Sequence, residues 1–172
     1  MGYSTDFEGV IKIEPALNQE EITYLNAFFD TRHMQRTGGP YVIGESEEDV
    51  TEYNQPPEEQ PGLWCNLWIN EEGTEMQWSQ CEKTYDLGEW VAYVIEHFIK
   101  PDCIAKQRHP DECAFFTGHT CNGILEASGE EAGDIWGIIV QNNTVGINEV
   151  DITPCDNLDI LNPETANLTV DS

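Results

Sequence analysis

The sequence predicts an α+β protein in which a mostly antiparallel sheet is covered by two helices. Two apolar stripes recur at helical spacing, near residues 18–31 and 86–100, and short segments of strand-like alternation flank them. The predicted order is strand, helix, strand, strand, helix, strand, and then two further strands. This order is typical of a ferredoxin-like split β-α-β unit, here with extra C-terminal strands. In that architecture both helices pack on one face of the sheet.

The first strand and the first helix are predicted from the N-terminal residues. Residues 7–13 alternate between apolar and polar side chains, as a half-buried strand does. Asn18 is the expected N-cap of the helix, and Glu21, three residues later, is its capping-box partner. The apolar stripe of this helix consists of Ile22, Leu25, Phe28 and Phe29.

The remaining elements follow the same rules. Residues 63–69 and 74–79 are expected to form a hairpin around a turn at 71–73. The second helix is predicted from an apolar stripe that ends before Pro101. Strands are expected at 122–128, 134–141 and 144–150, the last two joined by a two-residue turn at Asn142 and Asn143.

We expect one domain over residues 1–152 and a C-terminal tail over residues 153–172. Within the domain, residues 33–62 form an acidic and mostly irregular segment with a short strand expected at 41–43. Long connections without regular structure are usually functional or disordered, so this segment is the first place to look for a binding surface.

The net charge of the chain limits the classes of partner that it can bind. The chain has 33 acidic residues, seven Lys or Arg and a formal net charge of -26, and no Lys or Arg follows Arg108. Such a surface repels phosphate backbones and anionic membranes, so we expect the chain to bind neither nucleic acid nor membrane. Adaptation to high salt and simple solubility are alternative explanations of the acidity.

Localisation is expected to be cytoplasmic. Residues 1–10 have neither the basic nor the apolar region of a secretion signal, and no apolar run approaches the roughly 18 residues of a membrane helix. Under that expectation the six cysteines are free thiols.

Several short segments are distinctive as motifs. They are GYSTDFEG at 2–9, QPGLWC at 60–65, EKxY at 82–85 ahead of Glu89-Trp90, and Asn122-Gly123 with Gly129-Glu130. Together they resemble a family of small proteins of bacteria and their phages that has no established activity. The resemblance covers most of residues 2–150 but not the acidic loop, residues 102–113 or the tail. Members of the family usually have Gly where this chain has Cys81. The resemblance implies a bacterial host cytoplasm and supplies no catalytic residue.

Two groups of residues are of the types that bind metal ions, but their spacing in the sequence matches no standard metal-binding pattern. The first group consists of Cys103, His109, Cys113, His119 and Cys121, which are zinc-ligand types but contain no Cys-x-x-Cys pair. The second group, Glu126, Glu130, Glu131 and Asp134, surrounds one turn and matches no EF-hand pattern. We therefore predict no metal, no cofactor and no catalytic residue. A small metal- or ligand-binding enzyme using the Glu126–Asp134 cluster is the alternative.

The leading hypothesis is an acidic binding or inhibitor protein, such as a phage-encoded nucleic-acid mimic that blocks a basic nucleic-acid-binding protein of host defence. The contact residues are expected on the acidic loop and the 130–134 turn. They are Glu45, Glu47, Glu48, Asp49, Glu58, Glu59, Glu130, Glu131 and Asp134. An aromatic surface formed by Trp64 and Trp68 is the alternative contact site, for a partner or for self-association. The sequence leaves the oligomeric state open.

Overall fold

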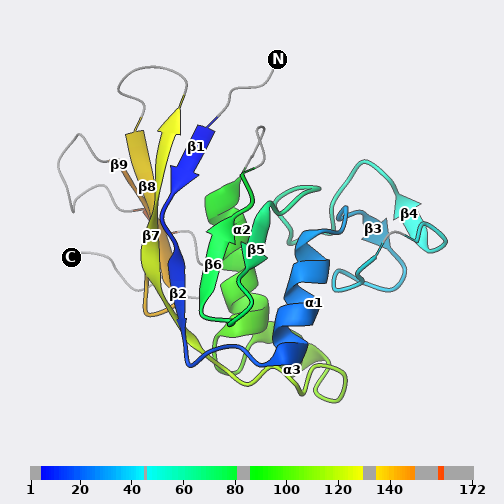
Figure 1. The fold of residues 1–172 in the computed structure, drawn as a ribbon. Coiled ribbons are helices and arrows are strands. Elements are labelled where there is room, and N and C mark those ends of the chain that lie inside the picture. The colour runs from blue at the N-terminus through cyan, green and yellow to red at the C-terminus, as the bar shows by residue number, and fades with distance from the viewer. Residues whose placement is uncertain (1–4, 45, 81–85, 130–134, 150–158, 161–172) are drawn as a thin grey trace.

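The computed structural model describes residues 5–44, 46–80, 86–129, 135–149 and 159–160, and it confirms the predicted α+β class. Figure 1 shows a sheet with helices packed against it and a small outlying pair of strands. The strands are β1 (Thr5–Glu8), β2 (Ile11–Glu14), β3 (Gln35–Arg36), β4 (Val50–Glu52), β5 (Leu67–Ile69), β6 (Glu75–Trp78), β7 (Thr120–Gly129), β8 (Ile135–Gln141), β9 (Thr144–Glu149) and β10 (Asp159–Ile160). The helices are α1 (Gln19–Phe29), α2 (Leu87–Val94), the π-helix η1 (Ile95–Ile99) and α3 (Ile104–Arg108). None of these helices is long and apolar enough to cross a membrane.

The main sheet is built from antiparallel neighbours. Its strands follow the order β10-β9-β8-β7-β2-β6-β5, and β1 pairs with the same strand, β7, as β2 does. The predicted two-residue turn between β8 and β9 is confirmed, since Asn142 and Asn143 have φ angles of 49° and 70°. Positive φ at both central positions is the type I′ geometry that matches the twist of a hairpin.

The first predicted strand is divided in two by a kink at Gly9 and Val10, so that β1 and β2 pair with different parts of β7. Gly9 has φ of 112°, and a Cβ there would lie 2.3 Å from the carbonyl oxygen of Ile124. Gly123 faces the same kink, because its Cβ would lie 2.4 Å from the carbonyl oxygen of Val10. The close backbone approach at the kink therefore depends on two residues without side chains.

Three predicted elements differ in the structure. The strand expected at 63–69 begins only at Leu67, because Asn66 adopts a left-handed φ of 62°. Residues 41–43 form no strand; the carbonyl of Tyr41 instead accepts a hydrogen bond from the Tyr24 hydroxyl at 2.5 Å. Within the expected tail, β10 pairs antiparallel with β9 and so extends the sheet.

Helix α1 begins at the predicted residue. Asn18 is its N-cap and Glu21 completes the capping box, so this prediction is confirmed. On the same helix the Asn26 side chain accepts from the Ile69 N–H at 2.8 Å and donates to the Ile69 carbonyl at 3.1 Å. Because β5 is the last strand in the sheet order, Asn26 occupies backbone groups that an open edge would offer to another chain.

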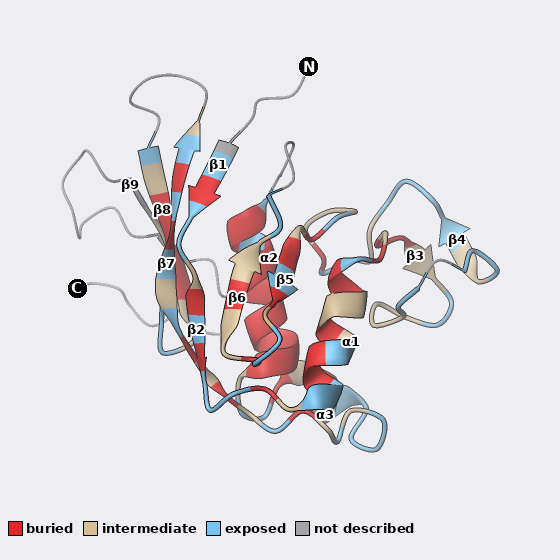
Figure 2. Cartoon of the chain, in the orientation of Figure 1, coloured by how far each residue is buried: buried red, intermediate tan, exposed pale blue. Residues whose placement is uncertain are grey.

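The second helix lies where the sequence predicted it, near residues 86–100, and it is deeply buried. It runs through α2 and continues as η1, and within residues 87–99 only Glu89 is exposed. Figure 2 shows this helix as the most continuously buried element of the chain. Trp90 and Phe98 are fully buried there, alongside Phe28 of α1 and Leu125 of β7. Burying a large apolar side chain contributes about 1.5–3 kcal/mol, so this helix is the centre of the core.

The segment 33–62 is more ordered than predicted. Strands β3 and β4 form a separate two-stranded sheet, which Figure 1 shows beyond α1 and away from the main sheet. The Gln60 side chain joins this segment to the helix core, because its amide donates to the Pro40 carbonyl at 2.8 Å and to the Tyr93 hydroxyl at 3.0 Å.

Candidate functional site

The acidic loop presents only part of its predicted charge to solvent. Glu47, Glu48 and Glu58 are exposed, and among the described residues none of them has a base within ion-pair distance. Glu45, Glu130, Glu131 and Asp134 lie outside the residues that the structure describes. The three exposed acids are therefore the described part of the predicted contact surface.

Asp49 and Glu59 are neutralised, although few bases lie near them in the sequence. Asp49 Oδ1 lies 3.4 Å from Nη1 of Arg36, and its other oxygen accepts from the Gly38 N–H at 3.3 Å. Glu59 Oε2 lies 3.1 Å from Nη2 of Arg108, which comes from the end of α3. The sequence did not indicate these partners, because only the fold brings Arg36 and Arg108 to the two acids.

Glu59 belongs to a polar cluster that the sequence did not indicate. The Tyr41 hydroxyl lies 2.6 Å from Nδ1 of His97 on η1, and Arg108 donates to the same hydroxyl at 3.4 Å. Glu59 Oε1 lies 3.7 Å from the other ring nitrogen of His97. The ring of His97 stacks on Tyr93, with centroids 3.9 Å apart. Four segments distant in sequence thus meet around one imidazole, which we name the His97 cluster.

Burial sets the protonation of the His97 cluster. It lowers the pKa of His97 to about 4 against the opposing effect of Glu59, and it raises the pKa of Tyr41 to about 12. The hydrogen bond from Arg108 holds the pKa of Glu59 below its ordinary value. At neutral pH the imidazole is therefore neutral. In the tautomer that carries its hydrogen on Nε2, which faces Glu59, Nδ1 accepts a hydrogen bond from the Tyr41 hydroxyl. This arrangement fastens the loop to the helix core.

A second buried histidine has the opposite charge state. His119 Nε2 lies 2.9 Å from Glu21 Oε2, and its Nδ1 donates to the Pro15 carbonyl at 2.6 Å. Glu21 also accepts from the backbone N–H groups of Asn18 and Thr117. Burial opposes both charges, but these hydrogen bonds outweigh it, so the pKa of Glu21 is lowered and that of His119 is raised. The two residues form a charged pair with nearly no exposure to water.

The Cys and His residues considered as zinc ligands have separate roles in the structure. His119 is committed to Glu21, while Cys65, Cys103, Cys113 and Cys121 are free thiols. Within the described residues, no three His, Cys, Asp or Glu side chains are arranged to hold a metal ion. Cys81 and Cys155 lie outside those residues.

The tryptophan surface and Glu126 lie elsewhere on the molecule. Trp64 and Trp68 are 46% and 41% exposed, but Trp64 precedes β5 and only Trp68 belongs to it. Glu126 is exposed on β7, where the register places it directly opposite Glu8 of β1. Like charges directly opposite one another in a sheet destabilise it, so this pair adds negative charge at a cost in stability.

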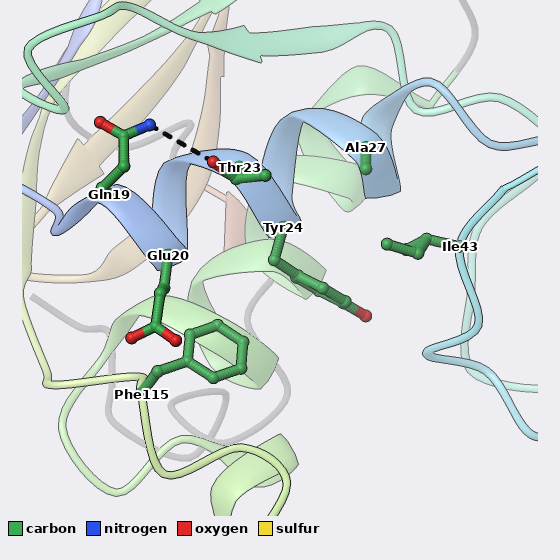
Figure 3. A pocket seen from close by; sticks show the side chains of 7 residues that line it. All are labelled: Gln19, Glu20, Thr23, Tyr24, Ala27, Ile43 and Phe115. Carbon is green, nitrogen blue, oxygen red and sulfur yellow. Dashed lines mark hydrogen bonds between the residues drawn. The ribbon is translucent and has the colours of Figure 1, made fainter.

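Two shallow grooves adjoin one another between α1, the 38–43 loop and the 109–116 segment. Their volumes are about 370 Å³ and about 340 Å³, and Tyr24 and Phe115 line both of them. In Figure 3 the side chain of Glu20 projects from α1 toward Phe115, the Tyr24 ring extends from the same helix toward the side of Ile43, and Ile43 points from the loop toward α1. We name this surface the Tyr24–Phe115 groove.

Comparison of the chain with models of protein families, with curated proteins and with solved structures finds no match. The chemistry of its surface therefore has to be interpreted from the chain itself.

Proposed function

We propose that this chain is an acidic binding protein that occupies the basic nucleic-acid-binding surface of a partner protein. One observation carries the proposal: 33 acidic residues face seven Lys or Arg, leaving a net charge of -26. Even if every base neutralised one acid, the excess would remain. Most small domains carry a net charge of about 2 to 8 in magnitude, because larger charges repel themselves in the compact state.

The placement of the bases supports the proposal. Lys12 lies 3.6 Å from Glu75, and Lys100 lies 2.8 Å from Glu96, while Arg36 and Arg108 bind the loop acids Asp49 and Glu59. Each of these bases serves a local pair within the fold. The remaining exposed acids, among them Glu47, Glu48 and Glu58, are therefore left to act on a partner.

The amount of charge is comparable to that of the duplex segment a domain of this size would replace. A domain of 172 residues has a radius of gyration of about 16 Å and hence a diameter of about 40 Å. Duplex DNA carries one charge per about 1.7 Å, or roughly 24 charges over that length. A positive cleft that accepts duplex DNA would accept this surface on electrostatic grounds.

The resemblance to small bacterial and phage proteins favours a partner in the cytoplasm of a bacterial host. Proteins of host defence that grip nucleic acid through basic clefts fit this setting, so inhibition of such a protein is the form of the proposal we favour. Contact through the exposed acids would exclude nucleic acid by occupancy, and it requires no catalytic residue.

The finer architecture is also a proposal. We infer that β2, α1, β5, β6, α2 and β7 form a ferredoxin-like split β-α-β unit. The strand order β7-β2-β6-β5 with antiparallel neighbours supports it, since it places one antiparallel strand between β2 and β5. An experimental structure with α1 and α2 on the same sheet face is the expected result, and helices on opposite faces would contradict it.

The functional proposal is tested by competition. The purified chain should displace a fluorescent duplex from purified basic nucleic-acid-binding proteins of a bacterial host, strongly at about 0.05 M salt and weakly at about 0.3 M. A chain that displaces no duplex at either salt concentration would leave high-salt adaptation or solubility as the explanation of the acidity.

The role of the loop is tested by two variants of equal charge. Replacing Glu45, Glu47, Glu48 and Glu58 with Gln should slow association with the partner about tenfold at low salt, because electrostatic steering is lost. The matched control replaces Glu14, Glu71, Glu72 and Glu89, which are exposed outside the loop. Equal slowing in both variants would show that net charge matters and that the loop has no special role.

A further inference from the structure

The Tyr24–Phe115 groove has aromatic walls that are held in place from behind. The Tyr24 ring packs edge-on against Phe115 and Phe116, with centroids 6.0 Å and 5.7 Å apart. Its hydroxyl donates to the Tyr41 carbonyl, and burial raises its pKa, so the ring stays a neutral phenol. A ligand would meet rings whose orientation is already set, which lowers the entropic cost of binding.

The polar rim of the groove is acidic. Exposed Glu20 lines one part of it and exposed Glu112 the other, and no Lys or Arg among the described residues lines either part. His109 lies 3.8 Å from Glu112. Arg108 is close in sequence, but its guanidinium is held by Glu59 and the Tyr41 hydroxyl. The groove thus combines aromatic faces with carboxylates in a strongly negative protein.

These features together select a cation with an extended flat surface. Aromatic faces attract cations through their quadrupole, and a guanidinium adds stacking because it is planar and only weakly hydrated. An ammonium group is a compact and strongly hydrated charge, so it gains less from the same walls. A nearby carboxylate also suits the fork of donors on a guanidinium.

We propose that the Tyr24–Phe115 groove takes an arginine side chain of the basic partner, which stacks on Phe115 and donates to Glu20. The inference rests on the proposed function, because only a basic protein partner would present such a side chain to this surface. It adds a site of chemical selectivity to an interaction that is otherwise governed by charge.

The experiment compares hexa-arginine with hexa-lysine, two peptides of equal charge, by titration calorimetry at fixed salt. The expected result is that hexa-arginine binds about three- to tenfold more tightly. Addition of hexa-arginine should also shift the methyl resonances of Ile43, which lines the groove and is 38% exposed. The methyl resonances of Ile124, exposed on the outer face of the sheet, should stay in place.

Two variants localise the preference. Phe115→Leu keeps an apolar side chain but removes the aromatic face, and Glu20→Gln removes the acceptor charge; each should abolish most of the preference for arginine. Ile124→Ala is the control, because it removes apolar surface elsewhere. Circular dichroism and thermal unfolding establish that each variant is folded.

The outcomes separate the inference from the proposed function. Equal binding of both peptides overturns the arginine site and leaves a purely charge-driven protein. Binding of neither peptide overturns the proposed function as well. A preference that persists in Phe115→Leu overturns the location, and tighter binding of free arginine amide than of the peptide indicates a small-molecule ligand in place of a protein side chain.

Discussion

Two of the three buried histidines, His97 and His119, are alike in burial and opposite in charge. His119 lies against the carboxylate of Glu21, while His97 lies against the hydroxyl of Tyr41 and the ring of Tyr93. Both imidazoles are about 95% or more removed from water. The pKa of His119 is nevertheless raised, and the pKa of His97 falls to about 4.

The difference shows that the partner decides what burial does to a histidine. A carboxylate at hydrogen-bond distance compensates the cost of removing the charge from water, and a phenol does not. The His119 site therefore acts as a charged clamp between α1 and the residues before β7. The His97 cluster acts as a neutral fastening for the acidic loop, with its charged members Glu59 and Arg108 at the surface.

The largest expected effect comes from breaking the charged clamp. Glu21→Gln should lower the free energy of unfolding by about 3–5 kcal/mol, because it leaves His119 without its buried counter-charge. Urea denaturation at neutral pH measures the loss. Glu20→Gln is the matched control, since Glu20 is exposed on the same helical turn and its replacement should stay within about 0.5 kcal/mol. Similar losses for both variants would show that the clamp contributes nothing.

The second prediction concerns pH and the neutral site. His97 has a pKa of about 4 in the folded state and an ordinary value of 6.5, so the unfolded chain binds the proton first as pH falls. His97 therefore removes stability between pH 6.5 and pH 4, by about 2–3 kcal/mol. The quantity to measure is the free energy of unfolding of the wild type minus that of His97→Gln. This difference should decrease as pH falls from 6.5 to 4. A constant difference would contradict the neutral assignment.

The charged clamp should show the opposite sign. Because the pKa of His119 is raised, its contribution is complete below pH 6.5 and is lost as pH rises through the folded-state pKa. The contribution of Glu21, whose pKa is lowered from 4.5, is present above that value and is lost as pH falls through the folded-state pKa. The free energy of unfolding of the wild type minus that of His119→Gln should therefore increase as pH falls, over the range in which the His97 difference decreases.

A smaller effect is expected when the neutral site loses its donor. Tyr41→Phe removes the hydroxyl that bonds Nδ1 of His97 and should cost about 1–2 kcal/mol, because a buried acceptor is left unpaired. Chemical denaturation measures it. Tyr53→Phe is the control, since Tyr53 is 48% exposed and its replacement should change little. Equal stability of the two variants would mean that Tyr41 does not fasten the loop.

The smallest effect is expected at the surface of the same cluster. Glu59→Gln should cost about 0–1 kcal/mol and less at high salt, because half of the Glu59 side chain is exposed. A double-mutant cycle with Arg108→Gln isolates the pair. A coupling energy well above 1 kcal/mol would show that the pair is shielded from solvent and belongs with the buried clamp.

The main elements of the fold were predictable because each depends on local signals. The capping box at Asn18 and Glu21 satisfies helix N–H groups within one turn, so four residues of sequence suffice to recognise it. The type I′ turn at Asn142 and Asn143 is equally local. The kink at Gly9 was not predictable, because its requirement for glycine comes from Ile124 on another strand.

The candidate site was predicted less well than the fold. The exposure of Glu47, Glu48 and Glu58 was predictable from the density of charge in the loop, because carboxylates are almost never buried without a partner. The partners of Asp49 and Glu59 did not follow, because Arg36 and Arg108 reach them only through tertiary contacts. The burial of His97 at the centre of a polar cluster did not follow either, because Tyr41 and Glu59 reach it from other parts of the chain.

By itself, the sequence determined the α+β class, the start of α1, the last hairpin and the sign and excess of the charge. These properties depend on composition or on residues within one turn of each other, where short-range geometry decides the outcome. Only the tertiary structure decided which acids are neutralised, which histidine is charged and where aromatic rings form a groove. Such properties depend on the distance between residues far apart in the chain, and that distance exists only once the chain has folded.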